Sequence, residues 1–162
     1  MVARISVGKN LYGALAYNQN KVDEGGAKIL SAHLLRYPED GRFRPDESVR
    51  QFLEWMPNHY RTEKPVIHIS LNPHPDDVLT DGQLAEIGRE YMQRLGYGNQ
   101  PYLVFKHEDI GRHHIHIVSL RVDSEGRKVS DKFEYRRSKE ITELLEQKYG
   151  LHPAEGRKKG EE

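Results

Sequence analysis

The chain has 162 residues, of which 36% are hydrophobic and 31% charged, and its 25 basic and 25 acidic side chains leave no net charge. This composition predicts one solvated domain with a sizeable core, argues against membrane insertion because no window is apolar enough to span a bilayer, and counts mildly against a nucleic-acid partner. The absence of cysteine excludes disulfides and thiolate metal sites, and fits a cytosolic protein.

Strand-like and helix-like patterns alternate along the chain. Apolar residues at every second position predict the strands, which we place at 2–7, 28–35, 65–71, 102–107 and 114–120. Capping residues and apolar stripes predict the helices, which we place at 11–21, 46–56, 80–95 and 138–149. The expected N-caps are Asn10, Asp46, Thr80 and Ser138, and Gln83 completes a capping box with Thr80.

This order predicts an α+β fold with a central antiparallel or mixed β-sheet of about five strands. We expect the helices to pack mainly on one face of the sheet, as a two-layer sandwich. The other face would carry histidines, namely His68, His107, His114 and His116. Residues 1–153 form the predicted domain, and the charged segment 154–162 is expected to be a disordered tail or the start of a linker.

Three of these histidines are arranged as metal ligands. His114 and His116 lie two apart in an apolar run, so they share one face of a strand. A turn containing Asp109 and Gly111 would bring His107 opposite them. Three neutral imidazoles that converge in this way can bind a divalent transition metal and leave coordination positions open. The alternative is that they are ordinary half-buried strand histidines.

Basic residues beside aromatic ones suggest a surface for single-stranded nucleic acid, which needs only a local basic face. Arg36, Arg42 and Arg44 lie close to Tyr37 and Phe43, and Arg112 lies beside the histidine motif. Solvated surface is the commoner role for each of these groups. We nevertheless take Arg36, Arg42, Arg44 and Arg112 as the candidate DNA contacts.

The spacing of the histidines resembles the third motif of relaxases, the mobilisation nucleases of the wider HUH endonuclease group. That motif is carried here by His107-x-Asp109 followed after four residues by His114-x-His116. Residues 1–21, centred on Gly-Ala-Leu-Ala-Tyr-Asn, are similar to the first motif, and residues 68–73 with 79–83 are similar to the second. The resemblance thus extends over most of the chain.

The resemblance implies a relaxase catalytic domain over 1–153 that nicks and rejoins one DNA strand at an origin of transfer. It implies that Tyr17 is the nucleophile of a 5′-phosphotyrosyl intermediate, with Tyr12 as the alternative. Its implied metal ligands are His107, His114 and His116. Asp109 would either accept a hydrogen bond from one of these ligands or help to deprotonate the nucleophile, and Ser70 would contact the DNA backbone.

The implied cofactor is a divalent metal ion. Mg²⁺ or Mn²⁺ is the first expectation, and Zn²⁺, Ni²⁺ or another metal is the alternative. The implied partners are single-stranded or locally melted DNA, accessory mobilisation proteins and a coupling protein, in the bacterial cytoplasm. The chemistry is coherent, because a phenol is almost wholly protonated at neutral pH and needs a nearby positive charge or base to attack a phosphate.

Three other functions stay open. An HUH replication initiator or transposase would use a tyrosine after the histidine pair, so Tyr135 or Tyr149 would serve. A phosphoesterase would need two His-x-Ser/Thr motifs. The sequence has one of them, His68-Ile-Ser70, and lacks the second. A metal-stabilised, non-catalytic DNA-binding module would need no tyrosine at all.

Overall fold

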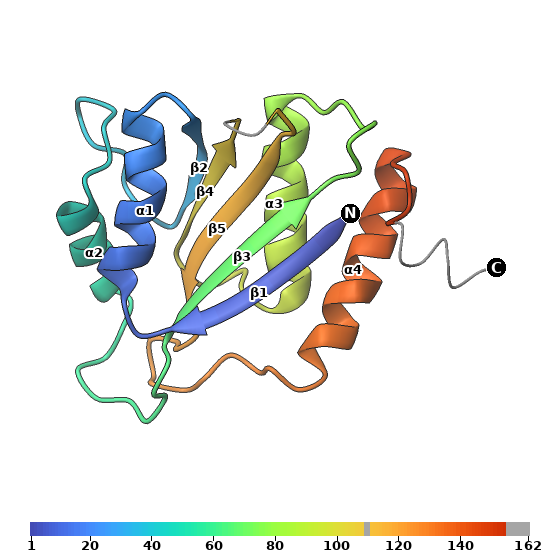
Figure 1. Ribbon diagram of the computed structural model, residues 1–162. Helices are drawn as coiled ribbons and strands as arrows, with labels where there is room; N and C mark the ends of the chain where they lie inside the picture. Colours follow the sequence, from blue (N-terminus) through green and yellow to red (C-terminus); the bar gives the residue numbers. More distant parts are fainter. Residues whose placement is uncertain (109–110, 155–162) are drawn as a thin grey trace.

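The computed structural model describes residues 1–108 and 111–154, which form a five-stranded sheet with four helices (Figure 1). The sheet order is β1-β3-β5-β4-β2, and all neighbouring strands are antiparallel. The strands are β1 (Val2–Gly8), β2 (Ala27–His33), β3 (Val66–Asn72), β4 (Tyr102–His107) and β5 (His114–Leu120). The helices are α1 (Leu11–Asp23), α2 (Pro45–Leu53), α3 (Asp81–Leu95) and α4 (Glu134–Tyr149). The predicted α+β class, element order and strand number are confirmed.

Two predicted helix starts are confirmed. The side chain of Asn10 caps α1, and Thr80 and Gln83 form the capping box of α3. The other two were misplaced. Pro45 begins α2 because its fixed φ suits the first helical position, and α4 begins four residues before Ser138, whose hydroxyl instead hydrogen-bonds the Tyr91 hydroxyl at 2.7 Å.

Both faces of the sheet bear helices, which refines the expected arrangement. The helices α3 and α4 cover one face, where they bury Ile67, Ile69, Ile115 and Ile117. The helices α1 and α2 pack on the opposite, histidine-bearing face, because Leu11 and Leu15 of α1 join a second apolar cluster there with strand residues such as Phe105.

The second layer is partial. Figure 1 shows α1 and α2 over the side of the sheet that holds β2 and β4, while β1 and β3 lie beyond them. On this uncovered part, Arg4 and Ser6 are exposed and Ser70 is half-buried. The histidine face therefore has an apolar, helix-covered half and a polar, accessible half that meet near β5.

Two sequence predictions concern residues outside 1–108 and 111–154. Asp109 lies outside the described residues, and so does the predicted tail from 155 to 162. Within 1–108 and 111–154, no helix is both long and apolar enough to cross a membrane.

A buried lysine ties β4 to the start of α3. Lys106 lies on the face that α3 covers, is only 5% exposed, and donates from Nζ to Asp81 at 2.6 Å. Lys28 contacts the other carboxylate oxygen at 2.5 Å. Hydrogen bonds from Lys106 and then Lys28 lower the pKa of Asp81 to about 2. The ionised carboxylate therefore compensates the buried ammonium at ordinary pH.

We predict that Asp81→Asn lowers the free energy of unfolding by about 2 kcal/mol, because it leaves the buried Lys106 charge without its anion, although solvent at the half-exposed carboxylate screens the pair. Lys106→Met should change it by less than about 1 kcal/mol, since an apolar side chain of similar length needs no counter-charge. Urea unfolding followed by circular dichroism measures both variants. Equal losses in the two would contradict this account of the ion pair.

The same ion pair predicts how the free energy of unfolding depends on pH. A carboxyl with a depressed folded-state pKa stabilises the protein fully above its unfolded value, about 3.9. That contribution is lost as the pH falls through the folded value of about 2. The stability gap between wild type and Asp81→Asn should therefore be complete at pH 5 and narrow below pH 4.

Candidate metal centre

The pairing of β4 with β5 brings three histidines together. In the antiparallel register His107 lies opposite His114, and the next residue of that face on β5 is His116. One ring nitrogen of each lies within 4.8 Å of one from each of the others. The ring centroids of His107 and His116 are 3.9 Å apart, and those of His114 and His116 are 4.9 Å apart. His113 projects to the exposed side, with its ring 3.8 Å from the Glu108 carboxylate.

The hydrogen bonds of His114 and His116 suit metal ligands. The carbonyl of Arg112 lies 3.2 Å from Nδ1 of His114. A carbonyl can only accept, so His114 donates from Nδ1 and its lone pair is on Nε2. Such outer hydrogen bonds commonly fix the tautomer of histidines that bind metals.

His68 extends this arrangement on β3. Its Nε2 lies 3.0 Å from Nδ1 of His116. Burial lowers the pKa of His68, which favours a neutral ring that can accept a hydrogen bond from His116. In the tautomer in which His116 donates from Nδ1 to His68, the lone pair of His116 is on Nε2. The three imidazoles and their partners therefore fit a divalent metal with open coordination positions.

The two candidate tyrosines differ in their relation to this cluster. The ring of Tyr17 stacks over that of His107, with centroids 6.2 Å apart, and is 51% exposed. Tyr12, 55% exposed, lies five residues earlier, about 140° around the helix. Tyr17 therefore borders both the histidines and solvent, which a nucleophile requires, although its role as nucleophile stays a prediction.

Sequence reasoning missed Asn18, the residue after Tyr17. Its side chain is completely buried, and its Oδ1 lies 2.8 Å from Nε2 of His107. The signal in the sequence was a polar residue on the same side of α1 as Leu11 and Leu15, at a spacing of seven and three. Such a residue must find a hydrogen-bond partner in the core it faces.

A polar row leads from the cluster to the edge of the sheet. Ser70 pairs with His116 on one side and with Arg4 of β1 on the other. The Asn72 side chain donates to the Ser70 hydroxyl at 3.1 Å. A hollow of about 280 Å³ adjoins this row, and Arg112 reaches it together with Arg4. The predicted DNA contacts Ser70 and Arg112 thus share a surface, to which the structure adds Arg4.

The three predicted arginines of the 36–44 loop are already ion-paired. Arg36 contacts Glu54 at 2.9 Å and Arg42 contacts Asp23 at 3.6 Å. Arg44 contacts Asp40 at 2.7 Å. DNA would have to compete with these carboxylates, so the predicted contacts of this loop stay predictions without geometric support.

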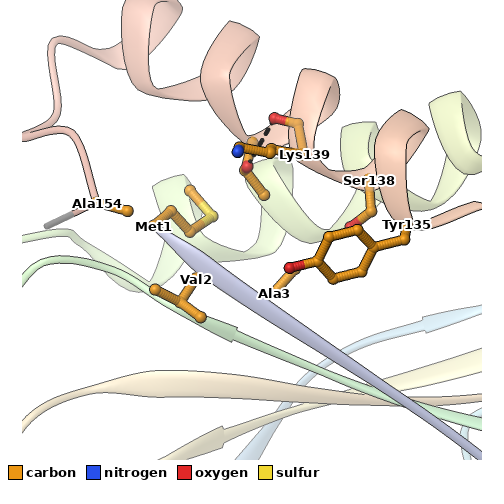
Figure 2. A pocket seen from close by; sticks show the side chains of 8 residues that line it. Met1, Val2, Ala3, Tyr135, Ser138, Lys139 and Ala154 are labelled. Carbon is orange, nitrogen blue, oxygen red and sulfur yellow. Dashed lines mark hydrogen bonds between the residues drawn. The ribbon is translucent and has the colours of Figure 1, made fainter. Parts of the chain in front are cut away.

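A second hollow lies on the other side of the sheet. Figure 2 shows it between the start of β1 and α4, with Tyr135 beside Ala3. Its volume is about 310 Å³ and it is lined by no histidine. Because α4 packs on the face opposite the three imidazoles, neither Tyr135 nor Tyr149 is near them.

Comparison with known proteins agrees with this site. The family model described as relaxase, MobA/VirD2-like, nuclease domain matches residues 17–151, which is most of the chain. That range includes Tyr17 and all three clustered histidines. Comparison with curated protein sequences gives no match.

We predict that His114→Ala weakens Mn²⁺ binding at least about 10-fold, because the site loses one of its three imidazoles. Isothermal titration of the purified protein with Mn²⁺ measures the affinity. The matched control is His113→Ala, which removes the neighbouring histidine on the exposed side and should leave the affinity unchanged. Equal effects of the two substitutions would exclude the cluster as the binding site.

Proposed function

Because the chain belongs to the relaxase family, as a MobA/VirD2-like nuclease domain, we propose that it nicks and rejoins a specific DNA strand through a tyrosine. Relaxases act in DNA mobilisation, and the proposed substrate is single-stranded or locally melted DNA at an origin of transfer. The observation that carries the proposal is the stacking of Tyr17 on His107, within a cluster of three imidazoles.

The proposed reaction is a transesterification. The Tyr17 hydroxyl attacks the scissile phosphorus and loses its proton, for which Asp109 is the proposed acceptor. The bond from phosphorus to the 3′ oxygen breaks, and that oxygen takes up a proton and leaves as a free hydroxyl. The 5′ phosphate stays on the tyrosine, so the bond energy is conserved and the 3′ hydroxyl can reverse the step.

The residues around Tyr17 would divide the other tasks. His107, His114 and His116 would hold the divalent ion, for which we propose Mg²⁺ or Mn²⁺. When bound, that ion would polarise the scissile phosphate and offset charge on its oxygens. Ser70, half-buried and paired in register with His116, would contact the DNA backbone beside the phosphate.

The polar half of the histidine face would receive the DNA strand. Its accessible part carries Arg4 and Ser6, and Arg112 lies at the adjoining hollow. Positive groups along such a groove attract the phosphate backbone, and this attraction weakens as salt rises. Accessory mobilisation proteins and a coupling protein complete the proposed set of partners.

Three observations favour this proposal over its alternatives. A replication initiator or transposase would use Tyr135 or Tyr149, and both lie on α4 across the sheet from the histidines. A phosphoesterase with paired His-x-Ser/Thr motifs needs a second motif, and the place of its Ser or Thr is taken by His116. A non-catalytic DNA-binding module would leave the exposed Tyr17 without a task.

We predict that the protein forms a covalent adduct with a single-stranded oligonucleotide from the DNA flanking its gene, in the presence of Mn²⁺ or Mg²⁺. The adduct appears as a slower band on a denaturing gel. Tyr17→Phe should abolish it, because phenylalanine lacks the attacking oxygen. The matched control Tyr12→Phe should retain it.

The other outcomes assign other functions. An adduct that survives Tyr17→Phe and is lost in Tyr12→Phe would show that Tyr12 is the nucleophile. Cleavage without any adduct indicates a metal-activated water and a phosphoesterase. Binding of the oligonucleotide without either product, over tiled sequences and with accessory proteins added, contradicts the proposed transesterification.

A further inference from the structure

The candidate nucleophile is followed in α1 by an asparagine that is fully buried. Asn18 has no exposed surface, and a buried amide that lacks hydrogen-bond partners costs free energy. Its Nδ2 donates to the carbonyl oxygen of Ala14 at 2.9 Å, one turn earlier in the helix. Its Oδ1 lies 2.8 Å from Nε2 of His107 on β4. One side chain thus joins the helix of Tyr17 to a candidate metal ligand.

These two contacts determine where His107 carries its proton. The Ala14 carbonyl only accepts hydrogen bonds, so the amide nitrogen of Asn18 must face it and the amide oxygen must face His107. An amide oxygen also only accepts, so His107 donates from Nε2. In the neutral ring, the in-plane lone pair is then on Nδ1.

We propose that Asn18 is a positioning residue that sets the tautomer and ring orientation of His107 and fixes α1 against the metal centre. Its effect on Tyr17 rests on the function proposed above, whereas its effect on His107 does not. Consecutive residues of a helix point about 100° apart. With Asn18 anchored inward on His107, Tyr17 is directed to the exposed side of α1, where its ring stacks on that of the buried His107.

The anchor has a consequence for both binding and chemistry. Ligand histidines that lose their outer hydrogen-bond partner typically lose metal affinity. A rotation of α1 would also displace the Tyr17 hydroxyl, and small displacements of a reacting group are costly in rate. Asn18 therefore couples metal binding to the placement of the nucleophile.

The first measurement uses the metal-free wild-type protein. Long-range ¹H–¹⁵N spectra of labelled histidines report which ring nitrogen is protonated, and we expect His107 to be the Nε2–H tautomer. Its signals are assigned with His107→Gln, which removes them. A wild-type His107 protonated at Nδ1 overturns the proposal without the need for any Asn18 variant.

Variants then test the role of Asn18. Asn18→Leu removes the acceptor at nearly constant volume, and should abolish the tautomer preference and weaken Mn²⁺ binding by about 10- to 100-fold. Asn18→Asp loses the donor to Ala14 but keeps an oxygen that accepts from Nε2, so Nε2 of His107 should still carry a proton in this variant. Asn20→Leu, the same change at an exposed position of α1, should alter neither readout.

An Asn18→Leu variant that is folded by circular dichroism and keeps both the tautomer and the Mn²⁺ affinity also overturns the proposal. Should it fail to fold, the wild-type spectrum and Asn18→Asp still decide. The proposed function fails separately, by absence of the covalent adduct in a protein whose His107 has the expected tautomer.

Discussion

The site depends on the pairing register of β4 with β5. This register sets His107 against His114, and the register of β5 with β3 places His116 beside Ser70. A slip of β5 by one residue would turn His114 and His116 to the face under α3, away from His107. Ile115 and Ile117, both fully buried on that face, oppose the slip, because it would exchange them with imidazoles. The apolar core thus fixes the geometry of the polar cluster.

The same face receives α1 because the helix carries its own apolar stripe. Leu11 and Leu15 pack in the cluster with Phe105 and Val118. That packing places the next turn of α1 over His107, where Tyr17 stacks on the ring and Asn18 hydrogen-bonds it. Covering half of the face with α1 and α2 also leaves the other half open, as a nuclease that admits a DNA strand requires.

Much of this arrangement follows from local pattern. The alternation of residues 114–117 is enough to predict a strand with His114 and His116 on one face, and the capping box at Thr80 is enough to begin α3. Such local patterns do not predict contacts between residues that are far apart in the sequence. The sequence did not reveal that α1 and α2 cover the histidine face, because a helical stripe does not say which side of a sheet it meets. It did not reveal Asn18 as a partner of His107, because 89 residues separate them. The arginines of residues 36–44 were predicted from composition, which does not show that each has a carboxylate partner.

The most direct test of the central claim is anomalous diffraction at the manganese edge, from crystals grown with Mn²⁺ and a single-stranded oligonucleotide. We expect one strong peak at a coordination distance of about 2 Å from a ring nitrogen of each of His107, His114 and His116. A phosphate oxygen of the oligonucleotide should complete the coordination on the side of Tyr17. A peak elsewhere, or none among the three imidazoles, would contradict the account.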